Sequence, residues 1–193
     1  MTSTATRMLD IAAQQFAEKG FSGASMRSIA SAVGTTQATI YHHFPNKHAL
    51  YLAVLARHFR ARTSDLPAEM ERIDNPEQQL QFLIQRILQL MAEDEQFRQL
   101  YLRELLEGNE ARLKDLADNV FGELTQATTR LLQQLAPHLD SHLMLFSLAG
   151  LVCHHLEARK LSPFVPGGRK AHQRLDVLAE HITQVMLHGV KAP

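Results

Sequence analysis

The sequence predicts an all-α fold, and three observations support that prediction. Leu, Ala, Gln, Glu and Arg, which favour helices, are abundant, and the 193 residues include no tryptophan. Apolar residues recur every three to four positions, and no segment shows the alternation of a half-buried strand. Gly34, Gly108 and the pair Asn75-Pro76 separate these segments as helix stop and start signals.

The clearest local pattern lies between Ser25 and Gly34. Ser25 can cap a helix whose apolar residues, Ile29, Ala30 and Val33, have helical spacing. Gly34 ends this helix because glycine tolerates the positive φ of a sharp turn. We therefore expect a short helix followed directly by a turn.

A second short helix is expected immediately after this turn. Thr35 or Thr36 can cap it, and Pro45 stops it just after Phe44. Two helices joined by a glycine-containing turn form a helix-turn-helix, whose second helix can enter the major groove of DNA. The alternative is a helical hairpin whose polar face is merely solvated.

The side chains on this second helix have the chemistry of a DNA contact. If Ile40 and Phe44 face inward, other faces must carry Gln37, Thr39, Tyr41 and His42. Gln can bond adenine through two hydrogen bonds, whereas Thr, Tyr and His can reach bases or phosphates. Lys47 is placed to meet phosphate as a point charge, and Arg27 in the preceding helix can meet phosphate or guanine.

Residues 6–52 resemble the N-terminal DNA-binding domain of the TetR family of bacterial transcriptional regulators. The similarity includes MLDIAAQQFAEKGF (residues 8–21), SMRSIASAVG (25–34) and ATIYHHFPNKHAL (38–50). The resemblance implies base-reading positions on the second helix and in the helix before it, and phosphate-anchoring positions around them. The expected DNA-binding residues are Ser25, Arg27, Thr36, Gln37, Ala38, Thr39, Tyr41, His42, His43 and Lys47.

The distribution of charge supports DNA binding independently of the resemblance. The whole chain is neutral, with 20 basic and 20 acidic side chains. Residues 1–63, however, hold seven Lys and Arg against two acidic residues, a net charge of +5, which leaves −5 on the remainder. A basic module joined to an acidic one concentrates the attraction for phosphate on one part of the molecule.

We expect two domains: a three-helix DNA-binding domain over residues 1–50 and a larger helical effector-binding and dimerisation domain over residues 51–193. Beyond a helix from about 46 to 62, periodicity predicts helices at 76–93, 95–107, 110–135, 138–160 and 169–188, with a loop at 162–168. The helix at 138–160 is apolar on more than one side, which indicates a second packing partner.

The resemblance implies that the last two helices pair with their copies in a second subunit. The expected dimer interface contains Leu143, Phe146, Gly150, Leu178, Ile182 and Val185. The alternative is that these helices simply bury against residues 76–135, because periodicity does not identify the surface against which a helix packs.

The resemblance also implies a small-molecule effector bound within the larger domain. Aromatic residues and Met form adaptable apolar walls, so the candidate pocket residues are Phe82, Met91, Phe97, Tyr101, Phe121 and Met144. A role in ordinary core packing is the alternative for each of them.

The remaining patterns favour no enzyme, metal or cofactor. His138 and His142 share one helical face, but local spacing supplies no third metal ligand. No phosphate-binding loop or nucleophile motif is present. The single cysteine, Cys153, suits a reducing cytoplasm, and no run of apolar residues approaches the length of a membrane span.

The sequence therefore predicts a homodimeric, cytoplasmic transcriptional repressor that binds a palindromic DNA operator and is released by a small, largely apolar effector. Two alternatives remain open. The first is a DNA-binding activator or architectural factor without a small-molecule ligand. The second is a helical enzyme or interaction module with an incidental helix-turn-helix.

Overall fold

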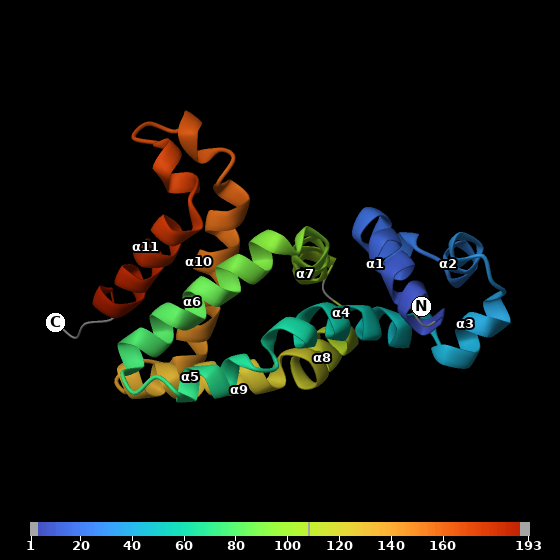
Figure 1. The fold of residues 1–193 in the computed structure, drawn as a ribbon, viewed down its shortest axis with the longest axis horizontal. Helices are drawn as coiled ribbons and strands as arrows, with labels where there is room; N and C mark the ends of the chain where they lie inside the picture. Colours follow the sequence, from blue (N-terminus) through green and yellow to red (C-terminus); the bar gives the residue numbers. More distant parts are fainter. Residues whose placement is uncertain (1–3, 108, 190–193) are drawn as a thin grey trace. The chain divides into compact units, whose positions relative to one another are not determined.

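A computed structural model describes residues 4–107 and 109–189, and all regular structure in these ranges is helical. The elements follow the chain as α1 (Thr4–Gly23), α2 (Met26–Val33), α3 (Gln37–His43), α4 (Lys47–Thr63), α5 (Leu66–Glu71), α6 (Pro76–Glu93), α7 (Glu95–Glu107), α8 (Glu110–Leu116), a π-helical turn η1 (Ala117–Phe121), α9 (Gly122–Leu135), α10 (Ser141–Ala158), the 3₁₀ turns η2 (Ser162–Phe164) and η3 (Lys170–Gln173), and α11 (Leu175–His188) (Figure 1). The predicted all-α fold is confirmed.

The helices form two compact units that interleave along the chain. The first unit comprises the described parts of residues 1–62 and 94–122, and the second those of 63–93 and 123–193. Helices α7 and α8 therefore pack in the same unit as the helix-turn-helix, although they follow α6 of the second unit in sequence.

In the first unit, α1 packs against α2 and α7, and α2 packs against α3. Its core is apolar and comes from every one of the first four helices, with fully buried side chains that include Met8, Phe16, Ile29, Ile40 and Leu50. This core holds α2 and α3 at a fixed angle, as a helix-turn-helix requires.

In the second unit, α6 packs along both α10 and α11, and these two also contact each other (Figure 1). The buried apolar residues include Leu83 and Leu88 of α6, Leu148 of α10 and Ile182 of α11. The short α5 packs against α6.

Several helix ends agree with the sequence signals. Asn46 accepts a hydrogen bond from the backbone N–H of Ala49 (2.8 Å) and caps α4, and Asn75 likewise accepts from Glu77 (2.8 Å) at the start of α6. Pro67 lies in the first turn of α5, where a missing N–H is tolerated.

Two expected helices differ in the structure. The helix expected over 110–135 is divided by the π-helical turn η1, which accommodates an extra residue within the helix. The last helix starts at Leu175 rather than near Arg169, because the backbone of Arg174 is extended (φ −81°, ψ 137°) after a 3₁₀ turn. Gly108, expected to end a helix, lies outside the described residues.

Candidate nucleic-acid interface

The start of α2 is held on α1 by a polar network. Ser25 and Ser28 form a capping box, in which each side chain bonds the backbone N–H of the other residue (3.0 and 3.2 Å). Ser28 Oγ also donates to the side-chain oxygen of Gln15 (2.7 Å), and Gln15 Nε2 donates to the Ser28 carbonyl (3.1 Å). Ser25 therefore has a structural role in addition to the expected contact with DNA.

The turn between α2 and α3 begins at Gly34 and ends at Thr36. Gly34 has φ +75°, and its N–H bonds the carbonyls of Ala30 and Ser31 at the end of α2. Thr36, one of the two expected caps, accepts a hydrogen bond from the backbone N–H of Thr39 (3.2 Å). The two threonine hydroxyls also lie 2.9 Å apart, so the first turn of α3 is closed by its own side chains.

Helix α3 has seven residues, and Ile40 is its buried side chain. Thr39 is half-buried, and the outer surface of the helix is polar and aromatic, with the exposed residues Gln37, Ala38, Tyr41, His42 and His43. Such a helix can bring amide, hydroxyl and imidazole groups against another surface while Ile40 keeps it attached to the unit. Arg27 is also exposed, in the first turn of α2.

Lys47 lies at the start of α4 and bonds the end of α1. Its Nζ donates to the carbonyls of Phe21 (2.8 Å) and Ala24 (3.0 Å) and lies 4.4 Å from the centre of the Phe21 ring. An ammonium group has three N–H donors, so one remains for a phosphate. The expected anchoring lysine is therefore already oriented by the protein.

The charge of the first unit is divided between its two chain segments. The basic side chains are concentrated in residues 1–62, whereas residues 94–122 hold four Lys and Arg against seven acidic residues, a net charge of −3. Arg57 pairs with Asp10 inside the first segment (2.9 Å), and His48 Nε2 of the first segment lies 2.9 Å from Asp115 of the second. The attraction for DNA is thus concentrated on the α1–α4 segment.

A buried polar network, which the sequence patterns did not single out, joins four helices of this unit. Glu104 of α7 is 2% exposed; one carboxylate oxygen accepts from Arg112 of α8 (2.9 Å) and the other from the hydroxyl of Tyr51 of α4 (3.1 Å). Arg112 lies over the ring of Phe21 of α1, 4.3 Å from its centre. Burial, and then the Glu104 charge, raise the pKa of the Tyr51 hydroxyl.

A second ionic contact lies at the end of α4. Asp94 accepts from the backbone N–H of Phe97 (2.9 Å), lies 2.7 Å from His58 Nδ1 and pairs with Arg62. Burial alone would raise the pKa of Asp94, but the hydrogen bonds from His58 and Phe97 and the charges of His58 and Arg62 lower it to about 2.

Three of the six expected effector-pocket residues come together in the first unit. Phe97 stacks on Tyr101 and on Phe59 of α4, and Phe121 meets both Phe59 and Tyr101 edge to face, with centroid separations of 4.7 to 6.3 Å. The other three, Phe82, Met91 and Met144, belong to the second unit.

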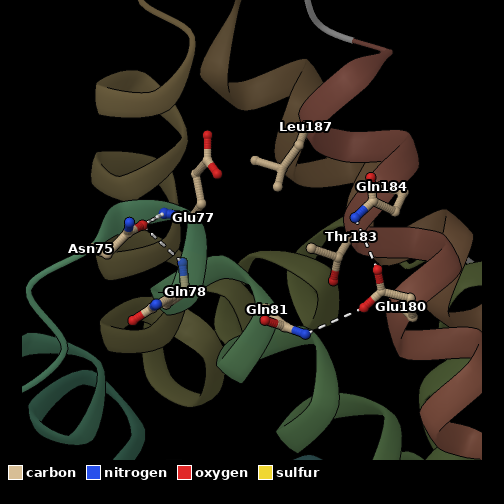
Figure 2. A pocket seen from close by; sticks show the side chains of 8 residues that line it. All are labelled: Asn75, Glu77, Gln78, Gln81, Glu180, Thr183, Gln184 and Leu187. Atoms are coloured by element: carbon tan, nitrogen blue, oxygen red, sulfur yellow. Dashed lines mark hydrogen bonds between the residues drawn. The ribbon is translucent and has the colours of Figure 1, made fainter.

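The second unit contains a polar pocket of about 210 Å³ between α6 and α11. Figure 2 shows Gln81 and Gln184 reaching Glu180, which accepts a hydrogen bond from each (3.3 and 2.9 Å). The full lining is Asn75, Glu77, Gln78, Gln81, Glu180, Thr183, Gln184 and Leu187, which includes none of the expected effector-pocket residues.

The expected dimer residues divide into exposed and buried sets. Leu143 and Phe146 of α10 are 64% and 58% exposed, and Gly150 and Val185 are also exposed. Leu178 and Ile182 are buried in the single subunit (6% and 0% exposed), on a helix that packs against α6.

Two histidines of the second unit lie close together. His155 of α10 meets His181 of α11 with ring centres 5.2 Å apart, and burial, followed by the charge of His181, lowers the pKa of His155. Within residues 4–107 and 109–189, no three His, Cys, Asp or Glu side chains are grouped as metal ligands. No helix in the same ranges has the length and apolar character needed to cross a bilayer.

Two protein families match the chain in succession. Residues 8–54 match the family described as bacterial regulatory proteins, tetR family. Residues 76–190 match the C-terminal domain of the HTH-type transcriptional dual regulator CecR. Together these matches include both the helix-turn-helix and most of the helices that follow it.

Among curated proteins, the transcriptional repressor AcnR of Corynebacterium glutamicum is 38% identical over 68 residues, which are 35% of this chain and 36% of AcnR. The chain thus matches about a third of that relative. Among solved structures, FadR of Bacillus subtilis in complex with stearoyl-CoA has a TM-score of 0.75 at 17% identity and covers 96% of this chain and 98% of its own.

A further solved structure is AibR in complex with isovaleryl coenzyme A and operator DNA, with a TM-score of 0.70 at 21% identity over 95% of this chain and 97% of its own. At these identities the two structures show a shared fold along nearly the whole chain. The matched N-terminal and C-terminal families, the curated relative and the fold agree. The chain belongs to the TetR family of bacterial regulatory proteins.

Proposed function

We propose that this protein is a homodimeric, ligand-responsive transcriptional repressor that binds a palindromic operator in the bacterial cytoplasm. The observation that carries the proposal is the outer face of α3, where polar and aromatic side chains project from a capped helix in a basic segment. Membership of the TetR family and the similarity to the repressor AcnR support it. Residues 1–50 would bind DNA, and residues 51–193 would bind the effector and the second subunit.

Within this interface, we assign base reading to Gln37 and Thr39, with Arg27 at a neighbouring base. Ser25, Tyr41 and Lys47 would anchor phosphates. Lys47 is suited to this role because two carbonyls of the chain already orient its ammonium group. The remaining contacts would come from Thr36, Ala38, His42 and His43.

Two subunits would be held together through the exposed apolar face of α10 and α11. Leu143, Phe146, Gly150 and Val185 are the exposed members of the expected interface. One recognition helix covers only a few base pairs, whereas two related by a two-fold axis read both halves of a palindrome about 34 Å apart.

The effector would be a small, largely apolar molecule with a polar group. Phe97, Tyr101 and Phe121 cluster around Phe59 of α4, the helix that leads from the helix-turn-helix. A ligand that separates these rings would move α4 and thereby change DNA affinity. FadR and AibR were solved with stearoyl-CoA and isovaleryl-CoA, which join an apolar acyl chain to a polar, charged coenzyme A. These two molecules are the first probes, and the acyl chain is the part that would lie among the rings.

DNA binding is tested with a sequence recovered by in vitro selection from random duplexes. Gln37→Ala should cost about 1–3 kcal/mol on the selected sequence and little on scrambled DNA, because a base contact is lost. Lys47→Ala should weaken both and flatten the salt dependence. Gln85→Ala, at an exposed position of α6, is the matched control. Failure of the wild type to select any sequence would overturn the proposal.

The effector response is tested by adding each acyl-CoA to the protein–DNA complex. The active probe should release DNA, and DNA should weaken binding of that probe by the same factor, since coupling is reciprocal. Tyr101→Ala and Phe121→Ala should leave DNA affinity largely intact but reduce the response. An unchanged response in both variants would place the effector elsewhere.

A second candidate is an activator that uses the same interface. The C-terminal match is to a domain named for a dual regulator, which is the observation that favours it. Transcription in vitro from a promoter carrying the selected sequence separates the two: a repressor lowers transcript yield, and an activator raises it.

A further inference from the structure

The chain passes between the two units three times. It leaves the first unit after Arg62, returns at Asp94 and leaves again after Gly122. The segment from α7 to η1 is therefore joined at both ends to helices of the second unit, α6 and α9. The first unit is thus joined covalently to the second at the end of α4 and at both ends of this α7–η1 segment.

Through Glu104, the α7–η1 segment is bonded to α4, the helix that follows the helix-turn-helix. This side chain uses both carboxylate oxygens, one for Arg112 of α8 and one for Tyr51 of α4, and all three groups are largely buried. It thus joins three helices through bonds that have a preferred length and direction.

The same network reaches α1. Arg112 lies over the Phe21 ring. Lys47 of α4 contacts the same ring and donates a hydrogen bond to the Phe21 carbonyl. Close by, Gly20 has φ +71°, and a Cβ there would lie 2.7 Å from a carboxylate oxygen of Glu107. The Glu107 side chain of α7 thus lies against the end of α1, where a glycine carries the positive φ.

The buried ion pair between Glu104 and Arg112 restricts the angle between helices more strongly than apolar packing would. Apolar packing of similar volume is often as stabilising as a buried ion pair, but it tolerates small rotations of one helix on another. A carboxylate bonded on two sides does not, because a rotation would strand a buried charge. Glu104 and Arg112 are therefore better suited to fixing an angle than to adding stability.

We propose that Glu104, Arg112 and Tyr51 are positioning residues for DNA recognition: they fix the angle of the helix-turn-helix on α7 and α8, and so set the half-site spacing that the dimer accepts. This inference rests on the proposed function and adds a role for residues remote from DNA. A single half-site does not sense this angle, whereas a palindrome does.

The test uses the double variant Glu104→Leu with Arg112→Met, which replaces the pair by apolar groups of similar size and leaves no stranded charge. Affinity is measured by fluorescence anisotropy for the selected operator, for operators with spacing altered by one or two base pairs, and for one half-site. We expect the wild type to prefer its own spacing by about 100-fold and the variant by about tenfold or less. Half-site affinity should stay within about twofold.

The matched control is Glu95→Leu with Arg98→Met, an ion pair of 3.7 Å within α7. It should keep the wild-type spacing preference. Tyr51→Phe removes only one of the two carboxylate contacts and should give an intermediate preference; it carries the test if the double variant does not fold. A folded variant with the wild-type spacing profile overturns the proposal. A wild type that binds no DNA overturns the proposed function instead, before any variant is measured.

Discussion

Two exposed surfaces of this protein differ in the chemistry that they offer to a partner. On α3 the exposed side chains other than Ala38 are polar or carry a polar end, such as Gln37, Tyr41 and His42. On α10 they include Leu143 and Phe146, whose apolar groups face solvent. Water can hydrogen-bond to the polar groups on α3, whereas the apolar groups on α10 are stabilised when another apolar surface covers them. A hydrated, charged partner fits α3, and a second apolar face fits α10.

The two surfaces also differ in what supports them. Helix α3 has seven residues and depends on the Thr36 cap and the buried Ile40. Helices α10 and α11 have 18 and 14 residues and rest on α6 through several buried side chains. Local hydrogen bonds are therefore a main support of the helix that carries the polar surface. Packing between helices distant in the sequence supports the helices that carry the apolar surface.

The largest effect is expected from Ile182→Asp, in the support of the apolar surface. Ile182 is 0% exposed, so the new carboxylate would be buried without a partner and should cost at least about 3–5 kcal/mol of unfolding free energy. Urea denaturation followed by circular dichroism measures this loss. If the variant keeps wild-type stability, the packing of α11 on α6 is not as described.

Phe146→Asp, on the apolar surface itself, should act on assembly rather than on folding. Removing an exposed aromatic contact and adding a charge should weaken self-association by about 2–4 kcal/mol, with little change in the stability of the monomer. Sedimentation velocity over a range of concentrations measures the association, and Gln85→Asp on α6 is the control. An unchanged association would place the subunit interface on another face.

The ionic contacts of the first unit predict that its stability depends on pH in the acid range. The pKa of Asp94 is lowered from 3.8 to about 2, so its stabilisation is complete above pH 3.8 and is lost as the pH falls towards 2. The shift corresponds to about 2 kcal/mol. The free energy of unfolding of Asp94→Asn, measured by urea denaturation, should therefore be lower than that of the wild type near pH 6. The two values should converge near pH 2.

The control for this measurement is Asp176→Asn in the second unit. Asp176 pairs with Arg174, but both side chains are more than half exposed, and solvent screens such pairs. Its difference from wild type should be small at every pH. A constant difference for Asp94→Asn across the same range would show that its role is packing rather than charge.

Much of the candidate DNA-binding surface could be predicted from the sequence because its structure is local. Ser25, Gly34 and Thr36 act on residues within four positions of themselves, so a short window of sequence contains both partners of each contact. The exposed face of α3 likewise follows from helical periodicity once Ile40 is assigned to the core.

The apolar surface and the Glu104 network depend on which helices pack together. Helical periodicity does not reveal this. Ile182 and Phe146 both lie on apolar helices, yet one is buried on α6 and the other is exposed. Glu104 gave one signal that was available: it follows Phe97 and Leu100 on an apolar helical face, where a carboxylate requires a partner. That the partners are Arg112 and Tyr51 could not be read from spacing, since Tyr51 is 53 residues away.

The smallest effect is expected from Thr36→Ala, in the support of the polar surface. Loss of the cap should cost α3 about 1 kcal/mol, and Thr36→Ser should restore it. Because only Ile40 otherwise holds this helix, the loss should appear as faster amide exchange in α3 and as a decrease of about fivefold in operator affinity. Asp140→Ala removes the corresponding cap of α10, where the bonds to His142 and Leu143 (2.9 and 3.1 Å) are backed by packing on α6, so exchange along α10 should change less. Equal changes in both helices would mean that packing supports α3 as strongly as α10, and the contrast between the two surfaces would then rest on chemistry alone.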